Sequence, residues 1–348
     1  MKFLIYGATG FTGKLMVEKA KQLNLFPLLS GRNSEKLKQI AEPVNLKYEP
    51  VNLNDKQGLL NLLNKVDLVI NCAGPFSATA EPMVGACLKT HTHYLDITGE
   101  ISVFERHRNL DQTAKDANIL IMSGVGFDVV PTDCLSAHMK SRMPDAEYLN
   151  LSVGGLSKIS AGTAKTAVEN IAKSFSVRRN GEIIQLKKPL YSTADFGKGE
   201  VETVSVSWGD VSTAYYTTGI PNIAVYFQLT SQTKKIIKMN RVIKWFLSLS
   251  PIQKKLKSQI EKRFKGPDET ERENSKAIIF GEAINSKGEK VLSKLITPEG
   301  YKLTCITALE IAQKVLSGNV KPGYFTPAML FGEKLITDID GVVLRDII

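Results

Sequence analysis

Short apolar runs alternate with amphipathic stretches along the first 125 residues of the chain. Strands are predicted at 2–6, 26–30, 46–51, 67–72, 93–97 and 119–123. Helical patterns fill the intervals, at about 12–23, 34–42, 55–64, 79–89 and 102–117. Apolar strands separated by helices are typical of a doubly wound parallel sheet. We therefore predict an α/β fold, in which ligands bind outside the carboxyl ends of the strands.

The pattern changes after about residue 146, where shorter alternating runs replace the regular repeat. Before that point, Pro131 is expected to open a helix that runs to about Met143. Strands are then predicted at 148–153, 182–186, 202–208, 277–284 and 303–307. Helices are predicted at 162–176, 220–230, 233–262, 307–317 and about 327–336. We expect an antiparallel or mixed sheet here, and a last strand at 342–344 that returns to the first domain.

A glycine-rich turn lies between the first predicted strand and the first helix, and reads Gly-Ala-Thr-Gly-Phe-Thr-Gly over residues 7–13. Glycines let the backbone approach a pyrophosphate, whose charge then faces the amide groups of the helix N-terminus. The pattern alone is weak evidence, but a preceding strand and a following helix are the context that a dinucleotide site needs. We assign to cofactor binding Gly7, Thr9, Gly10, Phe11, Thr12 and Gly13.

The end of the second predicted strand indicates which nicotinamide cofactor binds. Sites that prefer NAD place an acidic residue about 20 positions after the glycines, where it holds the ribose 2′-hydroxyl. Here the strand ends in Gly31, Arg32 and Asn33, without a carboxylate. A guanidinium suits a 2′-phosphate because its planar fork binds two oxygens. We predict NADP(H), against the alternative that Arg32 is a solvated loop residue.

Composition argues against several other classes of protein. Cys72, Cys87, Cys134 and Cys305 are far apart and form no CxxC pair, which argues against a disulfide framework and a zinc ribbon. The four histidines form no HExxH motif, and we predict no metal site. No apolar run reaches the ~20 residues that span a bilayer, and the first strand begins without a leader. We expect a cytoplasmic protein.

The net charge of +10 is concentrated in residues 234–265. This segment holds eleven Lys or Arg residues and one acid, Glu261. Apolar residues such as Trp245 and Phe246 lie between the cations, as in helices that bind a membrane interface. We weigh an anionic membrane surface against an ordinary packing helix with a solvated basic face, or a homodimer contact. Nucleic acid is not expected, because aromatic residues are few and no binding motif is present.

Several motifs together resemble those of the saccharopine dehydrogenase-like oxidoreductases, which include the trans-acting enoyl reductases of bacteria. Besides the glycine turn, they are Ser-Gly-Arg at 30–32, Asn-Cys-Ala-Gly-Pro-Phe at 71–76, Tyr-Leu-Asp-Ile-Thr-Gly-Glu at 94–100 and Gly-Phe-Asp-Val-Val-Pro-Thr-Asp at 126–133. Residues 160–163, 266–267 and 326–328 fit as well. The resemblance spans nearly the whole chain, and it is specific for the superfamily but not for a substrate.

The resemblance implies a Rossmann-type NADP-binding domain at 1–130 and an inserted α+β substrate or dimerisation domain at 131–322. The inserted domain would contain the basic segment 233–265, and residues 323–348 would return to the first domain. The resemblance also implies that the loop after the fourth strand lines the dinucleotide: Cys72, Ala73, Gly74, Pro75 and Phe76. Related folds often have an Asp near the adenine where this chain has Asn52 before Leu53. An amide can still form a hydrogen bond there, so we include both residues.

Candidate catalytic groups follow the fifth and sixth predicted strands. The Tyr-x-x-x-Lys pair of short-chain dehydrogenases is absent, since none of the ten tyrosines has a lysine four residues later. Alternation places Tyr94 and Asp96 on one face of their strand. A carboxylate in a closed cleft acquires a raised pKa and can donate a proton. We take as catalytic candidates Tyr94, Asp96, Glu100 and Asp128, against the alternative that these carboxylates cap helices or hold loop amides.

A predicted helix start at 160–163 offers a substrate site. Its amides could bind a carboxylate, carbonyl or thioester oxygen, which makes Ser160, Gly162 and Thr163 the substrate candidates, against an ordinary helix cap. From the resemblance we expect an NADP(H)-dependent oxidoreductase that reduces a C=C (enoyl) or C=N bond of a hydrophobic or carrier-bound acyl substrate. Saccharopine-type amino acid chemistry ranks lower, because the cations are not gathered around a cleft. Against these enzyme functions we weigh a non-catalytic NADP(H) sensor and a peripheral membrane protein.

Overall fold

The computed structural model describes residues 2–155, 158, 160–162, 164, 175–197, 199–231, 234, 247, 249, 252–253, 256, 258–260, 266–318 and 320–348. The chain forms two compact units. The first comprises Met1–Ala137 and Gly300–Asp340, and the second comprises His138–Glu299 and Gly341–Ile348. Most of the predicted helices at 162–176 and 233–262, and with them most of the basic segment, lie outside the described residues.

A seven-stranded parallel sheet forms the first unit, in the order β15-β6-β5-β4-β1-β2-β3. The strands are β1 (Phe3–Tyr6), β2 (Leu28–Gly31), β3 (Tyr48–Pro50), β4 (Leu68–Asn71), β5 (His93–Asp96), β6 (Leu120–Met122) and β15 (Gly323–Tyr324). The chain leaves β3 and continues on the other side of β1 as β4. The strand order therefore reverses between β1 and β4, where open α/β sheets bind ligands.

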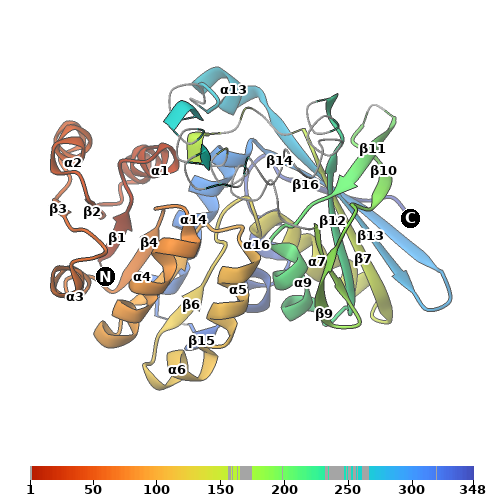
Figure 1. Ribbon diagram of the computed structural model, residues 1–348, viewed down its shortest axis with the longest axis horizontal. Coiled ribbons are helices and arrows are strands. Elements are labelled where there is room, and N and C mark those ends of the chain that lie inside the picture. The colour runs from red at the N-terminus through yellow and green to blue at the C-terminus, as the bar shows by residue number, and fades with distance from the viewer. Residues whose placement is uncertain are drawn as a thin grey trace. The chain divides into compact units, whose positions relative to one another are not determined.

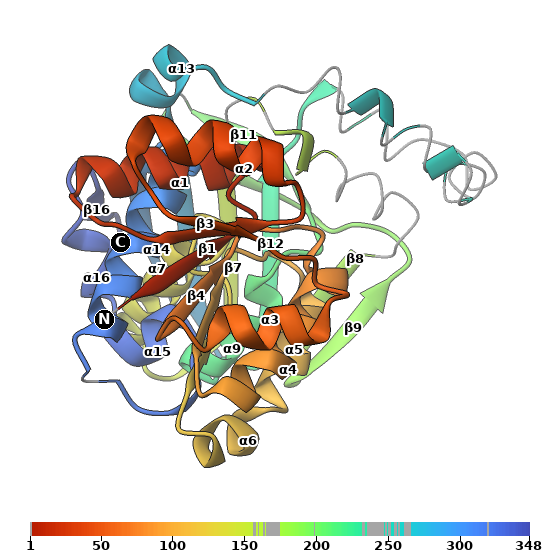
Figure 2. The same cartoon turned by 90° about the vertical axis from the view of Figure 1, so that its left-hand side faces the viewer.

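Helices cover both faces of this sheet (Figures 1 and 2). On one face lie α1 (Phe11–Gln22), α2 (Ser34–Ala41) and α14 (Gly300–Leu316), and on the other α3 (Lys56–Leu63), α4 (Phe76–Thr90) and α5 (Ile101–Arg108). The other helices of this part are η1 (Glu42–Val44), α6 (Asp111–Asp116), α7 (Val130–Arg142), α15 (Pro327–Phe331) and α16 (Lys334–Thr337). Because helices cover both faces, β1 and β4 are buried throughout, and they are apolar apart from Asn71 at the end of β4. This is the doubly wound, Rossmann-type fold that the sequence predicted.

A nine-stranded mixed sheet forms the second unit, in the order β10-β11-β12-β7-β13-β14-β16, with β8 and β9 paired beside β12. The strands are β7 (Ala146–Gly154), β8 (Phe175–Arg179), β9 (Glu182–Leu186), β10 (Tyr191–Asp195), β11 (Glu200–Ser205), β12 (Asn222–Gln228), β13 (Lys276–Asn285), β14 (Lys290–Pro298) and β16 (Val343–Asp346). Helices α9 (Asp210–Thr218) and α13 (Glu269–Asn274) accompany them. Along β13 buried and half-buried residues alternate, as expected for a strand with two different faces.

Four of the predicted elements are wrong, among them the helix at about 327–336, which is divided into α15 and α16. Residues 220–230 form strand β12 rather than a helix, because a short continuous apolar run looks alike in a buried strand and a buried helix. Residues 303–307 lie inside α14, whose mostly buried surface hides the helical period. The predicted helix at 102–117 is divided into α5 and α6 near Asn109 and Leu110.

The C-terminal part of the chain also differs from the prediction. The chain returns to the first unit already at Gly300 and leaves it after Asp340, instead of returning at 323. The last strand, β16, pairs antiparallel with β14 of the second unit and does not join the first sheet. β15 is the strand that extends the first sheet, beside β6.

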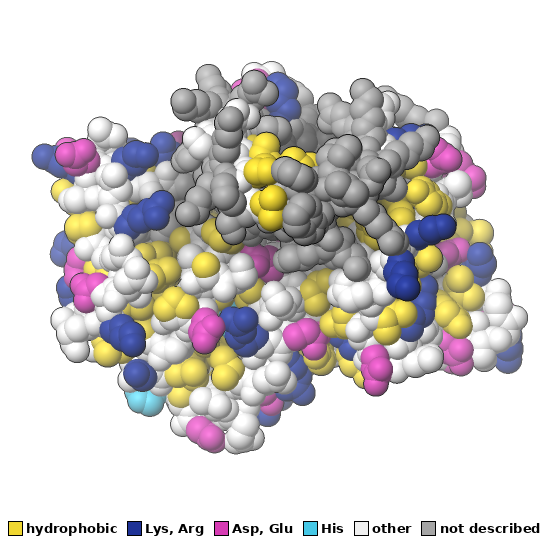
Figure 3. Space-filling model, in the orientation of Figure 1, with side chains coloured by type: hydrophobic (Ala, Val, Ile, Leu, Met, Phe, Trp, Pro, Cys, Tyr) yellow, Lys and Arg dark blue, Asp and Glu magenta, His cyan; other side chains and the backbone are white. Residues whose placement is uncertain are grey.

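No helix in the described part of the chain is long and apolar enough to cross a membrane. On the face drawn in Figure 3, the coloured Lys and Arg side chains are interspersed with Asp and Glu rather than gathered in one patch. The proposed membrane and homodimer contacts of the segment 233–265 therefore stay predictions.

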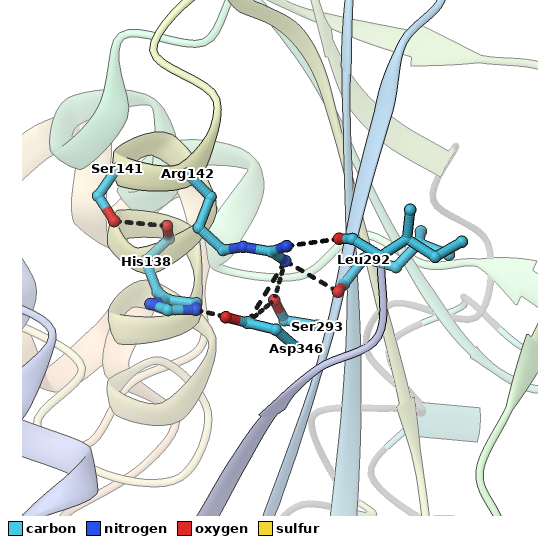
Figure 4. Close-up of polar contacts among 7 residues, drawn as sticks. His138, Ser141, Arg142, Leu292, Ser293 and Asp346 are labelled. Atoms are coloured by element: carbon cyan, nitrogen blue, oxygen red, sulfur yellow. Dashed lines mark hydrogen bonds and ion pairs between the residues drawn. The ribbon is translucent and has the colours of Figure 1, made fainter.

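The guanidinium of Arg142 joins the last strand, β16, to other elements of the second unit (Figure 4). Arg142 donates from Nη1 to Leu292 O at 2.9 Å and to Ser293 Oγ at 2.8 Å. Its Nη2 donates to Ile348 O at 2.5 Å. One side chain thus joins the end of α7 to β14 and to the residues that follow β16.

A carboxylate of β16 completes this cluster. Asp346 Oδ1 accepts a hydrogen bond from Ser293 Oγ at 2.7 Å and lies 2.9 Å from His138 Nε2 and 3.3 Å from Arg142 Nη1. Burial raises the pKa of the Asp346 carboxyl, but its hydrogen bonds with His138 and Ser293 outweigh this, so the pKa lies below its ordinary value. The pairing of β16 therefore depends on polar contacts as well as on its ladder.

Replacing the guanidinium should loosen this strand without unfolding the unit. Arg142→Met removes the hydrogen bonds that the charged guanidinium donates, which are worth about 2 kcal/mol in total. Hydrogen exchange at the amides of Val343–Asp346 should then become at least about tenfold faster, as expected for easier local opening. Arg345→Met, an exposed change on the same strand, is the control and should leave the exchange unchanged. Equal protection in both variants would contradict the assigned role of Arg142.

Candidate functional site

The turn between β1 and α1 is built on two glycines that have no room for a side chain. Gly7 has a φ of +83°, and a Cβ at this residue would lie 2.8 Å from Ala73 N. A Cβ at Gly13 would overlap Gly7 O. The end of β1, the first turn of α1 and the loop after β4 therefore approach one another closely, at the place where the strand order reverses.

The N-terminus of α1 is prepared for an anion. Gly10 is the N-cap and offers no side-chain hydrogen bond, and the first turn contains no acidic residue. The amide groups of Phe11, Thr12 and Gly13 lie in the first turn of α1. No helical carbonyl precedes them, so the helix itself offers them no acceptor. These amides and the helix dipole favour negative charge there. The cradle fits the pyrophosphate of a dinucleotide.

Arg32 lies at the carboxyl end of β2, beside this turn. Gly7 N and Ala8 N both donate to Ser30 O, at 2.9 and 3.3 Å, and so bind the turn to β2. The Arg32 side chain is exposed, and it forms no ion pair within the described part of the chain. Its position fits the 2′-phosphate of an adenosine ribose. Further along the same edge, the Asn52 side chain accepts from Asn54 N at 3.0 Å and shapes the loop after β3, where Leu53 is half-buried.

The loop after β4 is held by polar side chains. Asn71 Oδ1 accepts from Ala73 N at 3.0 Å, and Thr79 Oγ1 donates to Ala73 O at 2.5 Å. Cys72 N donates to Tyr6 O at 2.8 Å. Gly74 and Pro75, which follow, are exposed. The loop is thus fixed against β1, with its exposed residues at the carboxyl edge of the sheet.

Glu100 caps the helix that follows this loop. Its Oε1 accepts from Phe76 N at 2.8 Å and its Oε2 accepts from Ser77 N at 3.0 Å. The N-terminus of α4 therefore already holds a carboxylate, in contrast to that of α1. This geometry favours the capping alternative for Glu100, whose predicted catalytic role stays a prediction.

Asp96 is the centre of a fully buried hydrogen-bond network. Its Oδ2 accepts from Tyr94 Oη at 2.8 Å and from Ser123 Oγ at 3.0 Å, and its Oδ1 accepts from the amides of Thr98 and Gly124, each at 3.0 Å. Burial raises its pKa to about 6, against the opposing effect of these four donors. Four donors match the ionised form of Asp96, because a carboxylate has acceptor sites on both oxygens and no proton to donate.

Two side chains extend this network. Asn71 Nδ2 donates to Tyr94 Oη at 3.3 Å, and the pKa of that phenol is raised by burial. His107 Nδ1 lies 2.6 Å from Ser123 Oγ, and since the hydroxyl proton is given to Asp96, Nδ1 must carry the imidazole proton. Burial lowers the pKa of His107 to about 4, so the ring is neutral. The network joins the ends of β4, β5 and β6, and Tyr94 and Asp96 are too buried to meet a ligand directly.

Asp128 differs from the other candidate acids. It is half-buried, and its Oδ2 lies so close to Gly99 that a Cβ there would be 2.8 Å away. The dense surroundings raise its pKa to about 7. Of the four catalytic candidates, this is the partly exposed carboxyl whose pKa suits proton transfer near neutral pH.

The structure brings together the cofactor and catalytic candidates within the first unit. All of them lie at the carboxyl edge of the first unit's sheet. Ser160 and Gly162 belong to the second unit, where Ser160 O accepts from Ala164 N at 2.9 Å in a helical turn, and Thr163 lies outside the described residues. Sequence reasoning missed three polar residues that hold the site: Thr79, His107 and Ser123. Ser123 could have been found, since it is the last residue of the strand predicted at 119–123.

Comparison with known proteins finds one matching family model and several relatives of this chain. Residues 3–122 match the family described as "Saccharopine dehydrogenase NADP binding domain". A saccharopine dehydrogenase-like oxidoreductase of Rattus norvegicus is 28% identical over 213 residues, which is 53% of this chain and 49% of the relative. A trans-acting enoyl reductase of Mycobacterium bovis is 33% identical over 138 residues, 37% of this chain and 33% of the relative.

A third relative, from Arabidopsis thaliana, is 30% identical over 199 residues, 50% of this chain and 44% of the relative, and its name places it in mitochondria. The chain thus spans about half the length of the rat and Arabidopsis relatives. The solved structure of apo saccharopine dehydrogenase (L-Glu forming) from Saccharomyces cerevisiae covers 100% of both chains with a TM-score of 0.67 and 12% identity, which shows the same fold.

The family match agrees with the geometry of the first unit. The glycine cradle, the open N-terminus of α1 and the cation at Arg32 are what a phosphorylated dinucleotide requires. NADP(H), predicted from the sequence, is confirmed as the cofactor by this match. Residues 3–122 thus match a saccharopine dehydrogenase NADP-binding domain, and the chain is similar to saccharopine dehydrogenase-like oxidoreductases, as its motifs predicted.

Proposed function

We propose that this protein is an NADP(H)-dependent oxidoreductase that reduces a C=C or C=N bond. The observation that carries the proposal is the half-buried Asp128, with its raised pKa, at the same sheet edge as the open N-terminus of α1. Binding alone needs an anion cradle, but it does not need a carboxyl that titrates near neutral pH. The pair of features is what a reductase requires.

The residues of the first unit have separate roles in this proposal. The amides of Phe11, Thr12 and Gly13 bind the pyrophosphate, and Arg32 binds the 2′-phosphate. The loop of residues 72–76, fixed by Asn71, Thr79 and Glu100, lines the nicotinamide half. Bound NADPH supplies the hydride. Asp96 acts through its neighbours as a positioning residue, because its oxygens are fully occupied.

Asp128 supplies the proton. In its protonated form it gives the proton from a carboxyl oxygen to the substrate atom that does not receive the hydride. The carboxylate that is left takes a proton from water and returns to its starting state. The net change adds two hydrogen atoms across one double bond, so no other oxidant or reductant is needed.

A hydrophobic or carrier-bound acyl substrate fits this proposal best. It is supported by the trans-acting enoyl reductase among the relatives, although that similarity covers only 37% of the chain. Saccharopine-type amino acid substrates carry several carboxylates and need several cations around the reacting bond. At the carboxyl edge of the first unit, Asp96, Glu100 and Asp128 are carboxyl groups, which favours the acyl substrate. Turnover of NADPH with an enoyl thioester, and not with an imino acid, would support this choice.

Loss of the cation at Arg32 should change the cofactor preference. Arg32→Ala removes a charge-assisted hydrogen bond worth roughly 1.5–3 kcal/mol, so the Kd for NADPH should rise about 10- to 100-fold. The Kd for NADH should change less than about twofold. Both are measured by titrating the fluorescence of the reduced cofactor. Arg106→Ala, which removes a surface ion pair with Glu81, is the control. A parallel loss for both cofactors would refute the assignment of Arg32 to the 2′-phosphate.

The rate of reduction should follow the protonation of Asp128. Burial raises the pKa of this carboxyl to about 7, so the proton donor is present below that pH and is lost above it. We expect kcat to fall about tenfold per pH unit above pH 7. Asp128→Asn should lower kcat about 100-fold or more and remove this limb of the profile, with the Kd for NADPH unchanged.

Glu100→Gln is the matched comparison for Asp128→Asn. An amide oxygen still caps the N-terminus of α4, so this variant should keep the pH limb and lose less than about tenfold in kcat. Full activity of Asp128→Asn would exclude Asp128 as the proton donor. Tight binding of NADPH without turnover on enoyl, imine or ketone substrates would instead indicate the NADP(H) sensor.

A further inference from the structure

A cavity of about 410 Å³ lies between α1 and α2 in the first unit. Its lining includes Thr9, Lys14 and Glu18 on the side of α1, and Lys36 and Gln39 on the side of α2. Helices α1 and α2 both begin at the carboxyl edge of the sheet, because each follows one of its parallel strands. Thr9 and Lys36, near the starts of these helices, therefore lie at the end of the cavity that is closest to the cofactor cradle.

Thr9 connects this end of the cavity to Arg32. Its Oγ1 lies 4.0 Å from the point where a Cβ on Gly31 would be, and Arg32 is the next residue in the chain. The hydroxyl is half-exposed and can donate a hydrogen bond. It therefore faces the carboxyl end of β2, where the ribose of a dinucleotide is expected.

The N-cap of α2 fixes the backbone of Lys36 close to Arg32. Asn33 is the N-cap of this helix, and its Oδ1 accepts from Lys36 N at 2.9 Å. This bond fixes the first turn of α2 immediately after Arg32. Lys36 is four positions after Arg32 in the chain, and both residues precede the second turn of α2.

The cations around Thr9 are not neutralised by the protein. Within the described residues, Arg32, Lys14 and Lys36 form no ion pair, and Glu18 is the one acid in the cavity lining. Lys38, on the same helix, lies 3.6 Å from Glu42. The positive charge at the mouth of the cavity is thus left for an anion from outside the chain.

We infer that Lys36 and Thr9 complete a three-residue site for the 2′-phosphate, so that α2 contributes to cofactor choice together with Arg32. This inference rests on the proposed function, since it concerns the same cofactor. A phosphate monoester carries close to two negative charges at pH 7 and three acceptor oxygens. A bidentate guanidinium, an ammonium group and a hydroxyl together match its charge and its acceptors.

The test compares two lysines of α2 that differ in place but not in charge. Fluorescence titrations measure the Kd for NADPH and for NADH in wild type, Lys36→Gln and Lys38→Gln at two salt concentrations. Lys36→Gln should raise the Kd for NADPH about tenfold, leave that for NADH within about twofold, and reduce the salt dependence for NADPH. Lys38→Gln should change neither Kd by more than about twofold.

A second variant tests the hydroxyl without changing charge. Thr9→Val keeps the shape of the side chain, and should raise the Kd for NADPH about three- to tenfold while sparing NADH. Equal effects of Lys36→Gln and Lys38→Gln, or equal losses for NADPH and NADH, would overturn the inference but leave the proposed function intact. Failure of the wild type to bind NADPH would instead overturn the proposed function, and the inference with it.

Discussion

The close approach of β1 to the loop after β4 at Gly7 is the constraint on which the site depends. A side chain at Gly7 would meet Ala73 N at 2.8 Å, and the left-handed φ of this residue disfavours any replacement. This approach places the N-terminus of α1 next to the loop of residues 72–76, which we propose lines the nicotinamide half. Phosphates and ring can therefore be bound by one rigid edge, at the point where the strand order reverses.

A buried polar network gives that edge its rigidity. Asp96 accepts four hydrogen bonds and joins the ends of β5 and β6, while Tyr94 and Asn71 extend the connection to β4. A buried carboxylate is tolerated because every lone pair that faces the network is occupied. In our proposal two acids have separate tasks: the fully buried Asp96 maintains the loops, and the half-buried Asp128 donates the proton.

The sequence predicted the first unit well because its signals are local. The period of the apolar runs located six strands, and the residues after β1 and β2 indicated a phosphorylated dinucleotide. The part of the chain after residue 146 was harder to predict. Most residues of β12 and α14 are buried and apolar, and the spacing of apolar residues does not distinguish a buried strand from a buried helix. For Asp96 and Glu100 the sequence left catalysis and capping open as alternatives, because partners such as Ser123 and Phe76 are brought to them only by the fold.

The central claim is that the first unit binds NADP(H) and selects it through cations at the end of β2 and the start of α2. Isothermal titration calorimetry of the wild-type chain with NADP⁺ and with NAD⁺ tests it most directly. The account predicts one site per chain and a Kd for NADP⁺ at least about tenfold below that for NAD⁺. Equal affinities for the two cofactors, or no heat of binding with NADP⁺, would contradict it.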